Sequence, residues 1–208
     1  MNQLERNKSI LTKYIPEPAV ETIAEWIYVY DFKLKVKKSR ATKLGDYRAP
    51  HSGKNHEITI NHDLNKYAFL ITLVHEIAHL TNWNKHKDKV KPHGDEWKMH
   101  YKLLMGRFLV PEIFPDDIIY SLRKYMSNPA AASCSDINLL RVLKRYDANT
   151  DLMLLEDLPE GAKFSYNDTR HFVKGKQNRK RITCVEIHSK RVYLFNPIVE
   201  VKHLILHL

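Results

Sequence analysis

The sequence predicts an α+β fold, in which a helix-rich domain with a small antiparallel sheet precedes a small β-rich module at the C-terminus. Two strand-like patterns come first, and a long apolar segment of helical length follows them at residues 64–83. Beyond residue 157, β-branched and aromatic residues alternate with basic ones without a helical period. We therefore predict a domain over residues 1–127, a helical connector over 128–157 and a basic β-rich module over 158–208.

The small sheet is predicted from two segments near the N-terminus. After an amphipathic helix expected at residues 19–30, the stretch 32–40 alternates apolar residues with lysines, which is typical of a half-buried strand. Residues 57–61 form a second strand-like run after a glycine-containing loop. We expect the two strands to pair antiparallel, directly before the long apolar helix.

Further helices are predicted after the apolar one. Residues 94–110 carry a helical pattern that Pro111 ends, and residues 115–126 carry another. A last helix is expected at 136–146, with Asp136 as its N-cap.

The composition excludes several classes of protein. The N-terminus is polar and charged, unlike a signal peptide, and no run of about 18 apolar residues predicts a transmembrane helix. The two cysteines, Cys134 and Cys184, are too few for a disulfide scaffold or a four-cysteine zinc module. Each is expected to be a lone thiol; pairing with histidines in a second metal site is the alternative. A cytoplasmic protein without a membrane partner is expected.

The net charge of +10 is unevenly distributed. Residues 160–208 hold 10 Lys or Arg against 4 Asp or Glu, a net of +6 in less than a quarter of the chain. An excess of this kind favours a polyanionic partner such as nucleic acid, although a basic solvated surface is the simpler explanation.

One short motif carries the strongest chemical signal. His75 and His79 are four residues apart, so on a helix their imidazoles lie one turn apart on one face and can bind one Zn²⁺ ion. Glu76 lies beside that face, where it can act as a general base without being a ligand. Two histidines and a glutamate are costly to bury in an apolar helix unless they have such a role.

A catalytic zinc site needs a third protein ligand. His86 lies in a lysine-rich loop that is a poor place to fix a ligand. His93 precedes Gly94, which permits a sharp reversal before the next helix, and is the favoured candidate. Glu96, in a first helical turn where the helix dipole already explains an acid, and His100 remain alternatives.

Taken together, the two histidine motifs resemble a known family. His75-Glu76-Ile77-Ala78-His79, followed by His93-Gly94-Asp95-Glu96-Trp97 and Met99, is similar to the SprT-like metallopeptidases, the group that includes Spartan. The segments 44–47 and 58–61 also resemble that family's strands before the helix. The similarity covers roughly residues 15–105.

The resemblance implies a zincin-like fold in which His75, His79 and His93 hold one Zn²⁺ and Glu76 is the catalytic base. It also implies proteolysis of proteins bound or crosslinked to DNA. Many members carry a C-terminal four-cysteine zinc ribbon that this sequence lacks, and Cys184 could be its remnant. The family's mode of DNA contact therefore cannot simply be transferred.

Three further expectations concern substrate and partner. A protein substrate is expected to lie extended along the edge of the sheet made by the strands of Phe32 and Ile58. Trp97 is expected to pack the two helices together. Candidates to stabilise the oxyanion are Tyr47, His100 and Tyr101.

The C-terminal module offers a candidate contact with nucleic acid. A basic run flanked by Phe172 and Tyr193 could grip phosphates while a ring stacks on a base, or could simply be a charged hairpin edge. The run comprises Lys174, Lys176, Arg179, Lys180 and Arg181. Two other hypotheses remain: a nucleic-acid-binding protein whose zinc is structural, and a peptidase without a DNA link.

Overall fold

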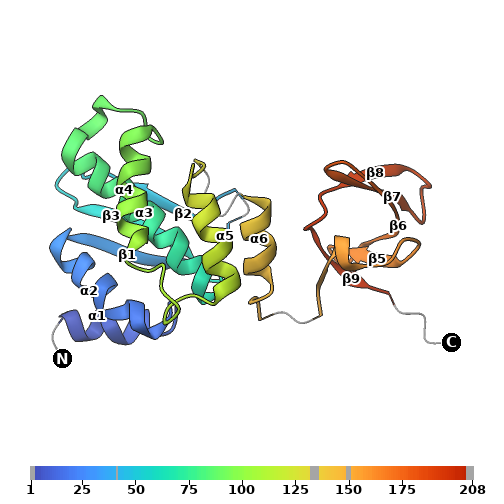
Figure 1. The fold of residues 1–208 in the computed structure, drawn as a ribbon, viewed down its shortest axis with the longest axis horizontal. Helices are drawn as coiled ribbons and strands as arrows, with labels where there is room; N and C mark the ends of the chain where they lie inside the picture. The colour runs from blue at the N-terminus through green and yellow to red at the C-terminus, as the bar shows by residue number, and fades with distance from the viewer. Residues whose placement is uncertain (1–2, 41, 132–135, 149–150, 205–208) are drawn as a thin grey trace. The chain divides into compact units, whose positions relative to one another are not determined.

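The computed structural model describes residues 3–40, 42–131, 136–148 and 151–204, and within it the chain forms two compact units, 1–147 and 148–208. The α+β class is confirmed, because one unit combines helices with a small sheet and the other holds a separate sheet (Figure 1). The boundary lies at residue 147, whereas the sequence suggested a connector over 128–157. No helix of the described residues is both long and apolar enough to cross a membrane.

The first unit contains six α-helices and three strands among its described residues. In chain order these are α1 Gln3–Leu11, α2 Val20–Val29, β1 Phe32–Lys37, β2 Gly45–Arg48, β3 His56–Asn61, α3 Lys66–His86, α4 Asp95–Gly106, α5 Asp116–Met126 and α6 Ile137–Lys144. Helix α6 belongs to this unit because Leu139, Val142 and Leu143 are buried in its core.

The small sheet differs from the prediction in its pairing. Its order is β1-β3-β2, and β1 runs parallel to the central strand β3, so the antiparallel pairing expected for them was wrong. A parallel pair needs a long crossover, and residues 38–55 provide one. Strand β2 lies within this crossover and supplies the antiparallel pair with β3.

Helix α3 is the centre of the first unit. Its residues Phe69, Leu70, Leu73, Val74 and Ile77 are fully buried, as its apolar sequence predicts. Asn65 begins the helix, because its side-chain oxygen accepts hydrogen bonds from the N–H groups of Tyr67 and Ala68. The amide of the same side chain donates to the backbone of Leu143 at 2.9 Å and to Asp147 at 2.6 Å, which ties the start of α3 to the end of α6.

The second unit is a six-stranded antiparallel sheet of order β4-β9-β5-β6-β7-β8. The strands are β4 Met153–Leu154, β5 Lys163–Tyr166, β6 Arg170–Asn178, β7 Arg181–Glu186, β8 Val192–Phe195 and β9 Glu200–His203. Its core contains Phe164, Phe172, Ile182 and Cys184, so the one cysteine that the structure describes is a buried free thiol. Cys134 lies outside the described residues.

We expect Asn65→Ala to destabilise the first unit by about 1–3 kcal/mol, because it removes both the cap of α3 and two donated hydrogen bonds. Asn65→Ser keeps a capping oxygen but lacks the amide, so its free energy of unfolding should fall between alanine and wild type. Urea denaturation measures all three proteins. Equal stability of the serine and alanine variants would contradict the capping role.

Candidate metal centre

Helix α3 brings two of the predicted ligands together. His75 and His79 lie one turn apart with ring centroids separated by 5.0 Å, and their Nε2 atoms are 3.3 Å from each other. His75 is buried and His79 is partly buried. As predicted from the i, i+4 spacing, both imidazoles point towards the same place.

The third histidine, His93, lies in the loop that joins α3 to α4. A tight turn, in which the N–H of Gly94 donates to the carbonyl of Lys91 at 3.0 Å, ends this loop. The ring of His93 lies 4.5 Å from that of His79 and 5.6 Å from that of His75. One ligand atom from each of the three lies within 4.8 Å of the others, so the group can hold a metal ion.

The two alternative ligands are not members of this group among the described residues. The side chain of Glu96 folds against Gly94. Its Oε2 atom lies 3.1 Å from the position that a Cβ atom on that glycine would occupy. His100 instead faces His86, with ring centroids 6.2 Å apart.

The chemistry of the three imidazoles fits a metal. Burial, together with the neighbouring histidines, lowers the pKa of His75 to about 2 and that of His79 to about 3, and burial also lowers the pKa of His93. All three are therefore neutral at physiological pH, which is the form that donates a lone pair to a metal. The buried Nε2 of His93 and Nδ1 of His75 have no hydrogen-bond partner in the described structure. An ion would account for the unpartnered Nε2 of His93, whereas His75 offers an ion a single nitrogen, and its Nε2 is the atom that faces His79.

Trp97, on the first turns of α4, packs the three rings together. The indole is fully buried, and its centroid lies 4.7 Å from His75, 5.3 Å from His79 and 4.8 Å from His93. On its other side it contacts Tyr101 at 5.2 Å. Trp97 thus has the packing role expected of it, and it also fixes the orientation of every candidate ligand.

Glu76 lies against strand β2. A Cβ added to Gly45 would be 2.5 Å from the Oε1 atom of Glu76 and 2.8 Å from Thr72, so only glycine allows this approach. The backbone of Tyr47 hydrogen-bonds the carboxyl group. Sequence reasoning missed the role of Gly45, although a glycine within a strand is itself a signal of close approach.

The pKa of Glu76 is raised to about 8, first by burial and then by the charge of Asp46, while Arg40 and Lys43 act in the opposite direction. Arg40 is held in place because its guanidinium donates to the side chains of Asn61 at 2.8 Å and Thr59 at 3.0 Å on β3. The carboxyl group therefore sits in a nearly dry site whose charges are fixed by the sheet. Without an ion the group therefore keeps its proton at neutral pH, and a cation held by the three histidines would lower its pKa and favour the carboxylate.

Tyr47 is the one oxyanion candidate that lines the cleft. Its hydroxyl lies 2.9 Å from Nδ1 of His56, its ring is parallel to that of His79, and burial raises its pKa. Tyr101 is instead buried and donates to the carbonyl of Ile71 at 3.4 Å. His100 lines a different hollow.

The cleft around the three histidines has a volume of about 610 Å³. Strand β2 forms one wall, and residues 87–93 form another. The sheet edge beside the site is therefore β2, whereas the sequence predicted the substrate at the sheet of the Phe32 and Ile58 strands. Strand β3 is paired on both sides, and β1 does not line this cleft. Lys87 stands over the Trp83 ring at 3.7 Å within this cleft, and its backbone has a positive φ of 54°.

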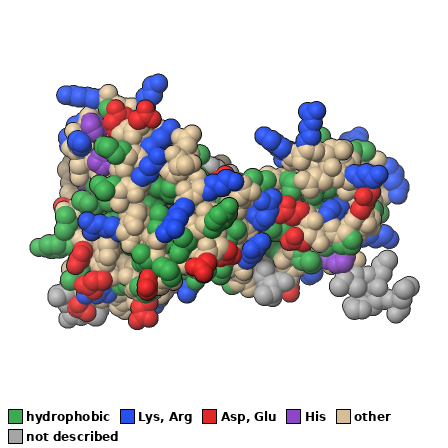
Figure 2. All heavy atoms as spheres, in the orientation of Figure 1, with side chains coloured by type: hydrophobic (Ala, Val, Ile, Leu, Met, Phe, Trp, Pro, Cys, Tyr) green, Lys and Arg blue, Asp and Glu red, His purple; other side chains and the backbone are tan. Residues whose placement is uncertain are grey.

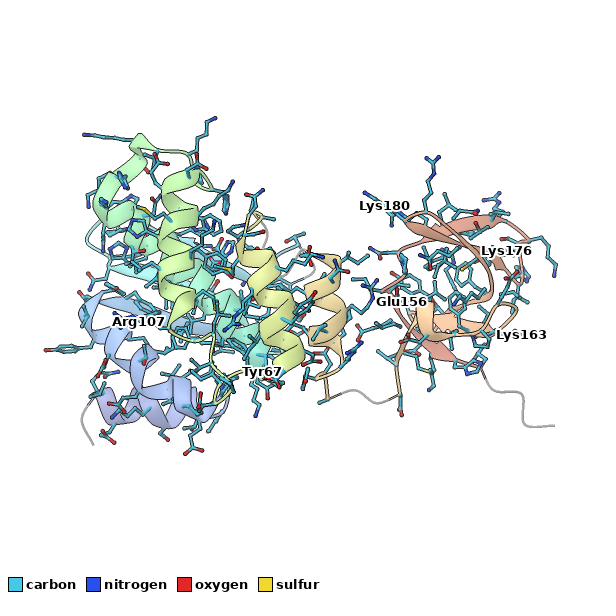
Figure 3. All side chains as sticks on the ribbon, viewed as in Figure 1. Tyr67, Arg107, Glu156, Lys163, Lys176 and Lys180 are labelled. Carbon is cyan, nitrogen blue, oxygen red and sulfur yellow. The ribbon has the colours of Figure 1, made fainter. Side chains whose placement is uncertain are left out.

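The five residues predicted to contact nucleic acid differ in their exposure to solvent. Lys174 is buried, and its ammonium donates to the carbonyls of Glu156 and Leu158, so it is not presented to a ligand. The other four side chains are exposed around the β6–β7 hairpin, and Figure 3 shows Lys176 and Lys180 pointing outward. These are Lys176, Arg179, Lys180 and Arg181. Alternation along β6 places Lys174 on the same face as buried Phe172, which is why it points inward.

Comparison with known proteins supports the resemblance seen in the sequence. Residues 21–113 match the SprT-like family. The matched segment runs from the first turn of α2 to residue 113, beyond the end of α4, and it includes all four residues of the candidate centre. No curated protein and no solved structure matches the chain. The SprT-like family is metallopeptidase-like, and its dependence on a metal agrees with the three clustered histidines.

The raised pKa of Glu76 predicts a pH-dependent cost to the metal-free fold. The folded carboxyl holds its proton up to a pH of about 8, whereas the unfolded one releases it near 4.5, so stability falls as the pH rises between these values. Glu76→Gln removes this loss, and we expect it to stabilise the metal-free protein by on the order of 3 kcal/mol at pH 8 and by little at pH 5.

Denaturation of both proteins in the presence of a chelator, at pH 5 and pH 8, measures the difference. A gain that is the same at both pH values would show that the effect is packing and not ionisation.

Proposed function

We propose that this protein is a zinc-dependent endopeptidase whose metal ligands are His75, His79 and His93 and whose general base is Glu76. The observation that carries the proposal is the meeting of three neutral imidazoles with one buried carboxyl group in a single cleft. Three protein ligands with room for a fourth position are typical of catalytic zinc, whereas structural zinc is closed by four.

A zinc ion held there would supply Lewis acidity that polarises a scissile carbonyl and acidifies water. The residues of the chain provide the rest. The carboxylate of Glu76 accepts the proton of the attacking water and delivers it to the leaving amine nitrogen. Gly45 allows strand β2 to lie close against this carboxyl group, which keeps the group beside the cleft during both transfers. The Tyr47 hydroxyl is the candidate donor to the developing oxyanion.

The substrate is proposed to bind as an extended segment beside β2. Among the described residues this strand pairs only with β3, so its other edge is free to form backbone hydrogen bonds at the mouth of the cleft. Recognition through the backbone tolerates many side chains, which suits an enzyme for varied proteins.

We further propose that the substrates are proteins bound or crosslinked to DNA. The basic charge of the chain and the exposed residues of the β6–β7 hairpin support a polyanionic partner. Lysines are also exposed near the centre, in the segment that leads to His93, as Figure 2 shows near the histidines. These are Lys85, Lys87, Lys89 and Lys91.

Glu76→Gln should reduce peptide hydrolysis by at least about 10³-fold while leaving one zinc per chain, because it removes the base and no ligand. His93→Ala should lose both zinc and activity. Zinc content and cleavage of a DNA-bound protein measure the two effects. Wild-type activity in the glutamine variant would reject the catalytic role, and full zinc in His93→Ala would reject that ligand.

Replacing Lys176, Arg179, Lys180 and Arg181 together by glutamine should weaken DNA binding and lower the salt dependence of log K by up to about four. Binding is measured by fluorescence anisotropy at several salt concentrations, with cleavage of a DNA-bound substrate in parallel. The control replaces Lys98, Lys102, Arg123 and Lys124 on α4 and α5. An unchanged slope would reject the β6–β7 hairpin as the DNA contact, and cleavage indifferent to DNA would reject the DNA partner and keep the peptidase.

A further inference from the structure

A second hollow of the first unit lies away from the metal centre. A groove of about 1110 Å³ runs between helix α1 and strand β1, and it shares no lining residue with the cleft of the histidines. Its walls are mainly apolar, and Phe69 of α3 lies at its base. The apolar residues along the walls are Leu4, Ile10, Leu11, Tyr14, Leu34 and Val36.

The β1 side of this groove is an open sheet edge. Among the described residues, β1 pairs with β3 alone. The carbonyl of Lys37 accepts from the N–H of His62 across that pair, so alternation directs the backbone groups of Leu34 and Val36 to the opposite edge. The groove therefore exposes unpaired N–H and C=O groups beside an apolar floor, and this combination accepts an additional strand.

The rim of the groove is more apolar than an ordinary surface. Tyr28 is 79% exposed, Val29 67% and Ile10 44%. A further hollow of about 440 Å³ continues from Leu4 past Tyr28 and Val29. Hydrophobic side chains reach the surface over this end of the unit in Figure 2. Contiguous exposed apolar surface of this kind marks a site of interaction.

The charged residues around the groove indicate the chemistry of a partner segment. Lys33 and Lys37 are exposed on β1, and Arg6 lines the groove from α1. The one acid in the lining, Asp31, accepts a hydrogen bond from Asn55 at 2.7 Å. Glu25 lines the adjoining smaller hollow. The three basic residues therefore outnumber the two acids by one, and the excess positive charge lies along β1. A segment placed beside β1 with alternating side chains would put apolar residues into the groove and acidic residues against the lysines.

We propose that this groove binds an extended segment of a partner protein, with alternating apolar and acidic residues, as an added strand on β1. Six residues of β1 give a paired length of about 20 Å, enough for a short linear segment. The site is separate from the metal centre, so it would recruit a partner and would not hold the scissile bond.

The probe for the test is a fluorescein-labelled octapeptide of alternating valine and glutamate, with an alternating valine and lysine octapeptide as its counterpart. The full chain carries Glu76→Gln to keep the probe intact. We expect the acidic peptide to bind at least tenfold more tightly by fluorescence anisotropy. We also expect the amide protons of Leu34 and Val36 to become protected from hydrogen exchange, which charge attraction alone would not cause.

The charge reversal Lys33→Glu with Lys37→Glu should invert the preference between the two peptides. Both side chains are exposed, so the fold should survive. The matched control, Arg123→Glu with Lys124→Glu on α5, should leave the affinity within twofold of the parent. Equal binding of both peptides, no binding, or protection at β2 or β8 in place of β1 would overturn the proposal. The lysines would then serve only to keep the edge from aggregating.

Discussion

The packing of Trp97 against three histidine rings is the contact on which the rest of the candidate centre depends. Helix α3 can point His75 and His79 in one direction by its own geometry, but His93 comes from a separate loop. The indole contacts all three rings. The packing of α4 against α3 through this side chain therefore sets the spacing of the three histidines. A ligand set held by a buried aromatic side chain is ordered before any ion arrives, which reduces the cost of assembling the site.

The sheet plays the corresponding role for Glu76. Arg40 binds the side chains of β3 and anchors the long crossover, and the crossover places β2 beside α3. Gly45 then brings backbone against the carboxyl group without a side chain between them. The same strand thus lies against Glu76 and has a free edge among the described residues. In the proposed function, one element therefore sets the positions of both the base and the substrate.

The parts of the site that follow from local periodicity could be predicted from the sequence. The spacing of His75 and His79 needs only a helix, and the buried character of α3 follows from its composition. His93 was favoured because Gly94 follows it, and the resemblance to a family supported the choice, since a loop has no period that would place a ligand. The parallel pairing of β1 with β3 was missed because strand direction depends on the path of the crossover, which residue patterns do not encode. Lys174 was predicted to contact nucleic acid from its charge alone. The alternation of side chains along β6 instead places it on the buried face of the sheet.

The contact between Gly45 and Glu76 limits how the cleft can be altered by evolution or by design. Since no larger residue fits at position 45 without displacing the carboxyl group, the wall of the cleft nearest to Glu76 cannot be reshaped without losing this contact. Variation must come from the outer lining, where Ala49, Val90 and Pro92 face the same space. For the proposed peptidase, substrate choice and catalytic power would therefore evolve at different positions of one small cleft, the first freely and the second hardly at all.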